Sequence, residues 1–181
     1  RAAELLEEAG WVDTDNDGVR DKDGTKLSFN FMYPSERTLY ERLSKLLKDQ
    51  AARIGVDVQP DPFEWSVVIT RLNERDFEAM VMGWGGDIES DPYQLWHSSQ
   101  IGNRGSNYVG FDNTRADKLI ERARRTLDDE QRNAMMHELH RILHREQPYT
   151  FLFTRPTFRI VDKRLRNIRV HPLGLNYLEW Y

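Results

Sequence analysis

Cysteine is absent from the 181 residues of this chain, and so is any long uncharged apolar run. Without cysteine the chain can form neither disulfides, thiol nucleophiles nor cysteine-based zinc sites. No apolar stretch approaches the roughly 20 residues that a transmembrane helix needs, so we expect no membrane span. The 26 Lys and Arg side chains against 30 Asp and Glu leave a net charge of −4. This weakly acidic balance argues against a nucleic-acid partner, which a basic stripe would favour.

Common catalytic motifs are also missing. The sequence has no Gly-x-Ser-x-Gly elbow and no phosphate-cradling Gly-x-x-x-x-Gly-Lys segment. His137 and His140 do not form the His-Glu-x-x-His pattern of zinc proteases, because the second histidine comes one residue early. His140 and His144 could bind a metal as a pair, but a solvated polar helix face explains them better. We therefore expect a protein that is not an enzyme.

What is present is a regular alternation of strand and helix patterns. Extended segments are predicted over 27–33, 56–60 and 77–84, and helices over 34–54 and 62–76. In the first helix, the apolar face is predicted to hold Leu39, Leu43, Leu46, Leu47 and Ile54. Helical crossovers between successive strands imply parallel pairing with helices on the faces. The predicted fold class is therefore α/β, with a mostly parallel sheet flanked by helices.

The second half of the chain is predicted to be helical after a long irregular stretch. A segment rich in Gly, Asp, Ser and Asn covers 85–113, and loops of this length are usually functional or mobile. Helices are predicted over 114–127, with Leu127 on the apolar stripe, and over 128–146. Two extended pieces follow within 148–161, and a last strand is predicted at 168–171. The aromatic end of the chain could dock on a part of the protein that lies elsewhere, or pack on its own domain.

An acidic loop near the start has the spacing of a calcium-binding loop. Alternating carboxylates can converge on one cation, Gly18 permits the sharp turn, and a backbone carbonyl can add an oxygen. The candidate ligands are Asp13, Asp15, Asp17, Val19 and Asp21. Gly24, however, stands where the full motif has a bidentate Glu, and the flanks are not two helices. The alternative is a solvated acidic turn that leads into a β-hairpin.

The loop after the third predicted strand is the other candidate site. In parallel α/β sheets, ligands bind outside the carboxyl ends of the strands. Trp84 offers a flat apolar wall, Gly85 and Gly86 let the backbone approach a ligand, and Asp87 offers a carboxylate. A carboxylate beside an aromatic wall suits a ligand with a cationic amine. The alternative is a turn whose Asp caps the next helix, with Trp84 in the core.

These segments together resemble a known family. The stretches that carry the likeness are 3–11 with its Asp/Gly turn, 83–92, 107–123, and Leu127, Asp128, Arg132, Pro148 and 172–174. In this order they resemble the C-terminal lobe of the peptide-type solute-binding proteins of bacterial ABC transporters, family 5. The resemblance implies a periplasmic-binding-protein-like lobe over 1–165 and a tail strand over 166–181 that docks on the other lobe or on the hinge. It also implies a place at the periplasmic or extracellular face of the cytoplasmic membrane, and an ABC permease as partner.

The resemblance further implies which residues meet the solute. In peptide-binding members a carboxylate in the Trp-x-x-Asp segment pairs with the terminal amine of the peptide, and here that position is Asp87. The ligand-binding residues implied are Trp84, Gly85, Gly86, Asp87, Asp91, Asn107 and Tyr108. Glu89 and Asp91 add negative charge, which favours a peptide or another amine-bearing small solute. No cofactor is required, apart from possible calcium at the acidic loop. The alternatives are a calcium-stabilised interaction module and a hydrolase with an interlobe active site.

Asp87 gives the first testable prediction. Substitution of Asp87→Ala in the full-length protein should weaken solute binding by about 2 kcal/mol or more, because a buried charge would lose its partner. Affinity measured by calorimetry tests this, and an unchanged affinity would contradict the assignment.

Overall fold

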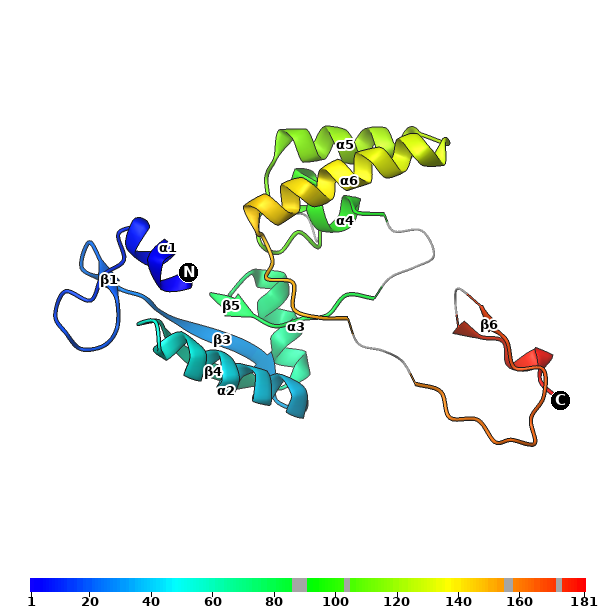
Figure 1. Cartoon of the computed structure of the whole chain (residues 1–181), viewed down its shortest axis with the longest axis horizontal. Coiled ribbons are helices and arrows are strands. Elements are labelled where there is room, and N and C mark those ends of the chain that lie inside the picture. Colours follow the sequence, from blue (N-terminus) through cyan, green and yellow to red (C-terminus); the bar gives the residue numbers. More distant parts are fainter. Residues whose placement is uncertain (86–90, 103–104, 155–157, 172–173) are drawn as a thin grey trace. The chain divides into compact units, whose positions relative to one another are not determined.

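The structure is a computed structural model of the chain (Figure 1). It describes residues 1–85, 91–102, 105–154, 158–171 and 174–181. The described residues form two compact units, Arg1–Trp84 and Gly85–Tyr181. Each unit has a hydrophobic cluster of its own. The chain therefore builds two separate cores, one around a sheet and one between helices.

The first unit is built on a small parallel sheet. Strands β3 (Ser28–Pro34), β4 (Asp57–Phe63) and β5 (Ala79–Met80) lie in the order β4-β3-β5, and both pairings are parallel. Helix α2 (Thr38–Ala52) connects β3 to β4, and α3 (Trp65–Glu74) connects β4 to β5. The predicted strand-helix-strand-helix-strand order and the parallel α/β fold class are thereby confirmed.

The alternation of side chains along β3 explains how both faces of the sheet are covered. Phe31 and Tyr33 point to one face and cluster with Ala51 of α2. Met32 points to the other face and is 2% exposed. Helix α3 contacts β3 and buries Val68. One helix thus covers each face of the sheet. Two right-handed crossovers that run in opposite directions along a sheet place their helices on opposite faces.

The structure corrects two details of this unit. The apolar stripe of α2 contains Tyr40, Leu43 and Leu47, which pack on the sheet. Leu39 and Leu46 were predicted on this stripe, but they are 40% and 56% exposed. The apolar stripe is narrower than predicted. Only the side chains that follow one another every three or four residues from Tyr40 face the sheet. The predicted strand 77–84 shortens to β5, an edge strand in the described sheet that pairs with β3 over two residues.

The side chain of Arg20 links the amino-terminal segment to the residues that follow α2. Helix α1 (Ala2–Glu8) leads through the acidic loop into a hairpin of β1 (Asp21–Lys22) and β2 (Thr25–Lys26). The Arg20 guanidinium donates from Nε to the carbonyl of Ile54 and from Nη1 to the carbonyl of Trp11, both at 2.8 Å. Because these carbonyls belong to separate segments, Arg20 fixes the acidic loop against the end of α2.

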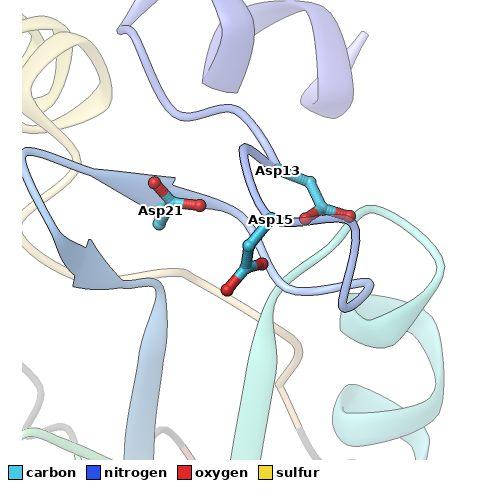
Figure 2. A group of neighbouring side chains, drawn as sticks. All are labelled: Asp13, Asp15 and Asp21. Atoms are coloured by element: carbon cyan, nitrogen blue, oxygen red, sulfur yellow. The ribbon is translucent and has the colours of Figure 1, made fainter.

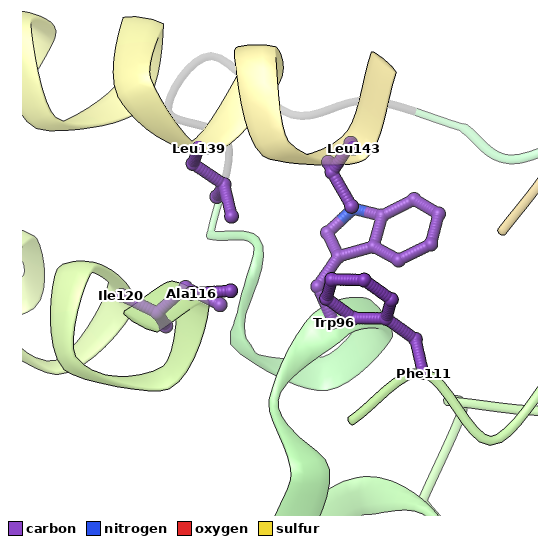
Figure 3. Close-up of a cluster of buried hydrophobic side chains, with 6 residues drawn as sticks. All are labelled: Trp96, Phe111, Ala116, Ile120, Leu139 and Leu143. Carbon is purple, nitrogen blue, oxygen red and sulfur yellow. The ribbon is translucent and has the colours of Figure 1, made fainter. Parts of the chain in front are cut away.

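The second unit contains the predicted helix pair. Helices α5 (Thr114–Arg125) and α6 (Asp129–Glu146) confirm the two helical predictions, and a short helix α4 (Tyr93–Trp96) adds an element that was not predicted. Figure 3 shows the core between them: Trp96, Phe111, Ala116, Ile120, Leu139 and Leu143. Leu127 was predicted in this stripe but is 94% exposed, because α5 ends before Thr126, whose backbone is extended. None of the helices in the described ranges is long and apolar enough to cross a membrane.

Asn107 holds the loop that leads from α4 to α5. Its side chain is fully buried, at 0% exposure. The amide nitrogen donates to the carbonyls of Phe111 (2.8 Å) and His97 (3.3 Å), and the amide oxygen accepts from the Phe111 N–H (2.9 Å). Nearby, Gly105 lies so close to Gln100 that an added Cβ would meet the carbonyl oxygen at 2.1 Å. The path of this loop therefore depends on an amide and on a glycine.

Residues of the tail, 166–181, form hydrogen bonds with one another. Strand β6 (Val170–His171) falls within the predicted strand 168–171, and it pairs with β7 (Gly174–Leu175), which was not predicted. A 3-10 turn, η2 (Tyr177–Glu179), follows. The N–H of Arg166 donates to the carbonyl of Tyr181 at 2.6 Å. The described residues of 148–161 are not in strands. A boundary between 165 and 166 stays a prediction.

Asn107 also gives a stability prediction. Substitution of Asn107→Ala should lower the free energy of unfolding by about 3 kcal/mol, because it leaves buried backbone groups of Phe111 and His97 without partners. Chemical denaturation measures the change. The control is Asn133→Ala on the exposed face of α6, which should stay within about 0.5 kcal/mol of the parent. Equal effects of the two substitutions would contradict a structural role of the buried amide.

Candidate functional site

The carboxyl ends of the three parallel strands meet at one edge of the first unit. β3 ends at Pro34, β4 at Phe63 and β5 at Met80. Glu36 follows the first of these ends, Trp65 the second and Trp84 the third. Parallel α/β sheets bind ligands outside this edge. We define Glu36, Trp65 and Trp84 as the carboxyl-edge cluster.

Both tryptophans of the carboxyl-edge cluster present much of their surface to solvent. Trp65 is 50% exposed and Trp84 is 48% exposed. The alternative interpretation that Trp84 is a core residue therefore does not hold for this chain. Indole rings combine a large apolar face with one N–H donor, and they are enriched where proteins bind partners. The edge thus offers apolar surface for a ligand.

A carboxylate connects two of the loops at this edge. The Oε1 atom of Glu36 accepts a hydrogen bond from the backbone N–H of Trp65 at 3.1 Å. Hydrogen bonds from its own backbone N–H and from that of Trp65 lower the pKa of the Glu36 carboxyl. The side chain is therefore ionised at neutral pH, and its acceptor atoms already face protein donors.

A cation also lies close to this edge. The Arg71 guanidinium stands 4.3 Å from the centroid of the Phe63 ring, and its Nη1 atom is 3.4 Å from a carboxylate oxygen of Asp76. Phe63 is the last residue of β4. The edge of the first unit therefore carries charge of both signs beside its aromatic surface.

The other predicted ligand residues stand as follows. Gly86 and Asp87, like Glu89, lie outside the described residues. Gly85 is described and exposed, and Tyr108 is half-buried. Asn107 is buried with its amide bound to backbone groups, so it has a structural role in the chain. Contact of any of these residues with a ligand stays a prediction.

Asp91 is neutralised within the second unit. Its carboxylate lies 3.1 Å from Nε of Arg124 and also accepts from the backbone N–H of Tyr93 at 3.0 Å. The Arg124 guanidinium is 4.3 Å from the centroid of the Tyr93 ring, which stacks on His97 at 4.4 Å. The predicted acidic character of this segment is therefore offset at Asp91 by a cation 33 residues further along the chain.

The acidic loop brings three of its predicted ligands together. Figure 2 shows Asp13, Asp15 and Asp21, whose carboxylate oxygens lie within 4.8 Å of one another. Within the described residues, the histidines of α6 do not belong to a group of three or more side chains placed to hold a metal ion. The carboxylates also have protein donors: Gly18 N–H bonds to Asp13 at 3.0 Å, and the Thr14 hydroxyl bonds to Asp21 at 2.8 Å.

Lys26 supplies a cation to the same loop. Its ammonium pairs with Asp15 at 3.1 Å and with Asp17. The hydrogen bond from Lys26, and then that from the Val19 N–H, lower the pKa of Asp17. The loop thus neutralises part of its own charge, and a calcium ion would compete with the ammonium for Asp15. Calcium at Asp13, Asp15, Asp17, Val19 and Asp21 stays a prediction.

Asp21 gives a prediction about pH. Hydrogen bonds from the backbone N–H and then the hydroxyl of Thr14 lower its pKa from the usual 3.8. A carboxyl with a lowered folded pKa stabilises the fold above its unfolded pKa, and the stabilisation is lost as the pH falls through the folded value. Carboxyl NMR should show Asp21 titrating below pH 3.8, and Thr14→Ala should raise that pKa. An Asp21 pKa at or above the usual value would contradict these contacts.

Comparison with known proteins shows relatives over nearly the whole chain. The oligopeptide-binding protein AppA of Bacillus subtilis is 36% identical over 174 residues, which cover 95% of this chain and 32% of that protein. The dipeptide-binding protein of Escherichia coli is 26% identical, over 76% of this chain and 26% of that protein. The chain therefore spans about a third of the length of the curated relatives that it matches.

Solved structures agree with this result. The structure of AppA from Bacillus subtilis in complex with a nonapeptide superposes with a TM-score of 0.85 at 34% identity, over 99% of this chain and 36% of that chain. NikZ from Campylobacter jejuni, in complex with Ni(L-His), gives a TM-score of 0.73 at 24% identity, over 81% of this chain and 30% of that chain. The NikZ likeness concerns the fold alone.

A family assignment follows from the sequence. Residues 1–106 match the sequence model described as bacterial extracellular solute-binding proteins, family 5 Middle. This segment contains the whole sheet and the carboxyl-edge cluster. Together with the AppA relative at 36% identity, it shows that the chain belongs to the family 5 bacterial extracellular solute-binding proteins.

Proposed function

We propose that this chain is one lobe of the extracytoplasmic solute-binding component of an ABC importer, and that a peptide or a similar amine-bearing solute contacts its carboxyl edge. The observation that carries the proposal is the pair of half-exposed tryptophans, Trp65 and Trp84, beyond the ends of parallel strands. The site would bind rather than transform its solute. Its role at the outer face of the cytoplasmic membrane would be to present the solute to a permease.

The relatives support a peptide as the solute class. The AppA structure is named as a complex with a nonapeptide, and other relatives are named as dipeptide-binding or di/tripeptide-binding proteins. A peptide in extended form offers side chains that indole rings can cover and a terminal amine that a carboxylate can pair with. Trp65 and Trp84 supply the rings, and Asp87 is the carboxylate that the sequence predicts for the amine.

The proposal also accounts for exposed apolar surface near the end of the chain. Phe151, Leu152 and Phe153 are 59%, 52% and 57% exposed, and Tyr181 is 79% exposed. Phe151, Leu152 and Phe153 are consecutive, and exposed apolar patches of this kind mark interaction sites. We propose that this segment and the tail over 166–181 dock on the other lobe or on the hinge of the longer protein.

Calorimetry on two proteins tests the proposal. The full-length protein should bind a synthetic nonapeptide, and this chain alone should bind it at least about 100-fold more weakly, because closure over the peptide supplies much of the affinity. Trp84→Ala in the full-length protein should weaken binding by about 10-fold or more. The control is Trp11→Ala, which lies before the acidic loop and should leave the affinity unchanged. Absence of peptide binding by the full-length protein would overturn the proposal, as would equal affinity of the isolated chain.

A further inference from the structure

We infer that Glu36 is a positioning residue that fixes Trp65 at the carboxyl edge for contact with the solute. This inference rests on the proposed function, since it assigns a role within the same site. The observation behind it is the hydrogen bond from the Trp65 N–H to Oε1 of Glu36, at 3.1 Å, between residues 29 positions apart. Glu36 is not assigned contact with the solute.

The two loops that this bond joins leave neighbouring strands in the same direction. β3 and β4 pair in parallel up to the last residue of each, Pro34 with Phe63. The N–H of Ser35 then donates to the carbonyl of Phe63 at 2.8 Å, which extends the pairing by one bond. The Glu36 side chain adds the next link across the gap where the chains diverge. It therefore sets where the loop after β4 leaves the sheet.

The same bond replaces a missing cap of α3. Trp65 is the first residue of this 10-residue helix, and the N-cap residue Glu64 makes no side-chain capping bond. The first N–H groups of a helix have no acceptor within the helix. Glu36 supplies an acceptor from a different loop, and its negative charge lies at the end of the helix that attracts anions. The helix therefore starts at a fixed point relative to β3.

The consequence concerns the indole of Trp65. A half-exposed ring has few packing contacts to fix it, so its place depends on the backbone that carries it. Ordering a mobile loop on binding costs free energy and lowers the affinity, whereas a loop that is already ordered does not carry this cost. Anchoring the Trp65 backbone by a charged acceptor thus prepares the ring for a solute. A charged acceptor also makes a stronger bond than a neutral one.

The positioning role of Glu36 can be distinguished from a general contribution to the stability of the fold. Glu36 is exposed, so its loss opens no cavity and buries no unpartnered side chain. Its effect should therefore appear in solute affinity through Trp65 and disappear when Trp65 is absent. Gln in place of Glu36 keeps an acceptor oxygen at the same distance along the side chain, so it should restore most of the effect.

A double-mutant cycle in the full-length protein tests the inference, with a synthetic nonapeptide as the probe and calorimetry as the measurement. We expect Glu36→Ala to weaken binding by about 3- to 10-fold and Glu36→Gln to stay within about 2-fold of the parent. Trp65→Ala should weaken it by about 10-fold or more. The double variant should bind like Trp65→Ala alone, because the two residues act through one contact.

Two controls separate the possible failures. Glu74→Ala removes an equal charge at the far end of α3 and should leave the affinity unchanged. Thermal unfolding of every variant should remain cooperative, and the loss of one helix acceptor in Glu36→Ala should lower the unfolding midpoint by no more than a few degrees. If Trp65→Ala weakens binding and Glu36→Ala does not, or if the two effects add, the positioning role is overturned while the proposed function stands. If the parent itself does not bind the nonapeptide, the proposed function fails and the positioning role fails with it.

Discussion

The parallel pairing of β3 with β4 is the constraint on which the first unit depends. Seven residue pairs fix the register, from Ser28 with Asp57 to Pro34 with Phe63. A slip of one residue along β3 would exchange its two faces, so Met32 would meet α2 and the ring of Tyr33 would meet α3. The same slip would move Glu36 relative to Trp65. Packing of the core and geometry of the carboxyl edge are therefore set by one register.

Much of this framework could be predicted from the sequence because its signals are local. Alternation along 27–33 and the four-residue spacing of Leu43 and Leu47 each reflect which side of an element meets the core. The prediction failed where burial depends on distant residues. Leu39 and Leu46 look equivalent to their neighbours in the sequence, but only the sheet's position decides which leucines it covers. Leu127 was misplaced for a similar reason, since the end of α5 decides that it points to solvent.

The candidate site was predictable only in part. Trp84 and Gly85 were predicted as ligand residues because the third predicted strand ends at Trp84, and their contact with a ligand stays a prediction. The same rule applied to the first two strands would have indicated Glu36 and Trp65. Their hydrogen bond could not be predicted, since it joins loops whose separation only the folded sheet defines. The pairing of Asp91 with Arg124 is equally non-local, and it changes the charge that the sequence assigns to that segment. In the acidic loop, spacing predicted that four carboxylates and the Val19 carbonyl would converge; Asp13, Asp15 and Asp21 lie together, and the pairing of Lys26 with this loop was not predicted.

Asn107 and the two edge tryptophans differ in how much of the side chain folding buries. Asn107 is fully buried, and the hydrogen bonds of its side chain all go to backbone groups of His97 and Phe111. These bonds therefore stabilise the fold of the loop. Trp65 and Trp84 are half-exposed, and the free energy of covering their remaining apolar surface is not used in folding this lobe. Under the proposed function, that free energy would become available when a solute or a second lobe excludes water from the rings. Glu36 holds Trp65 by its backbone N–H at the start of α3 while half of the Trp65 side chain stays exposed, so folding fixes where this residue stands without covering it.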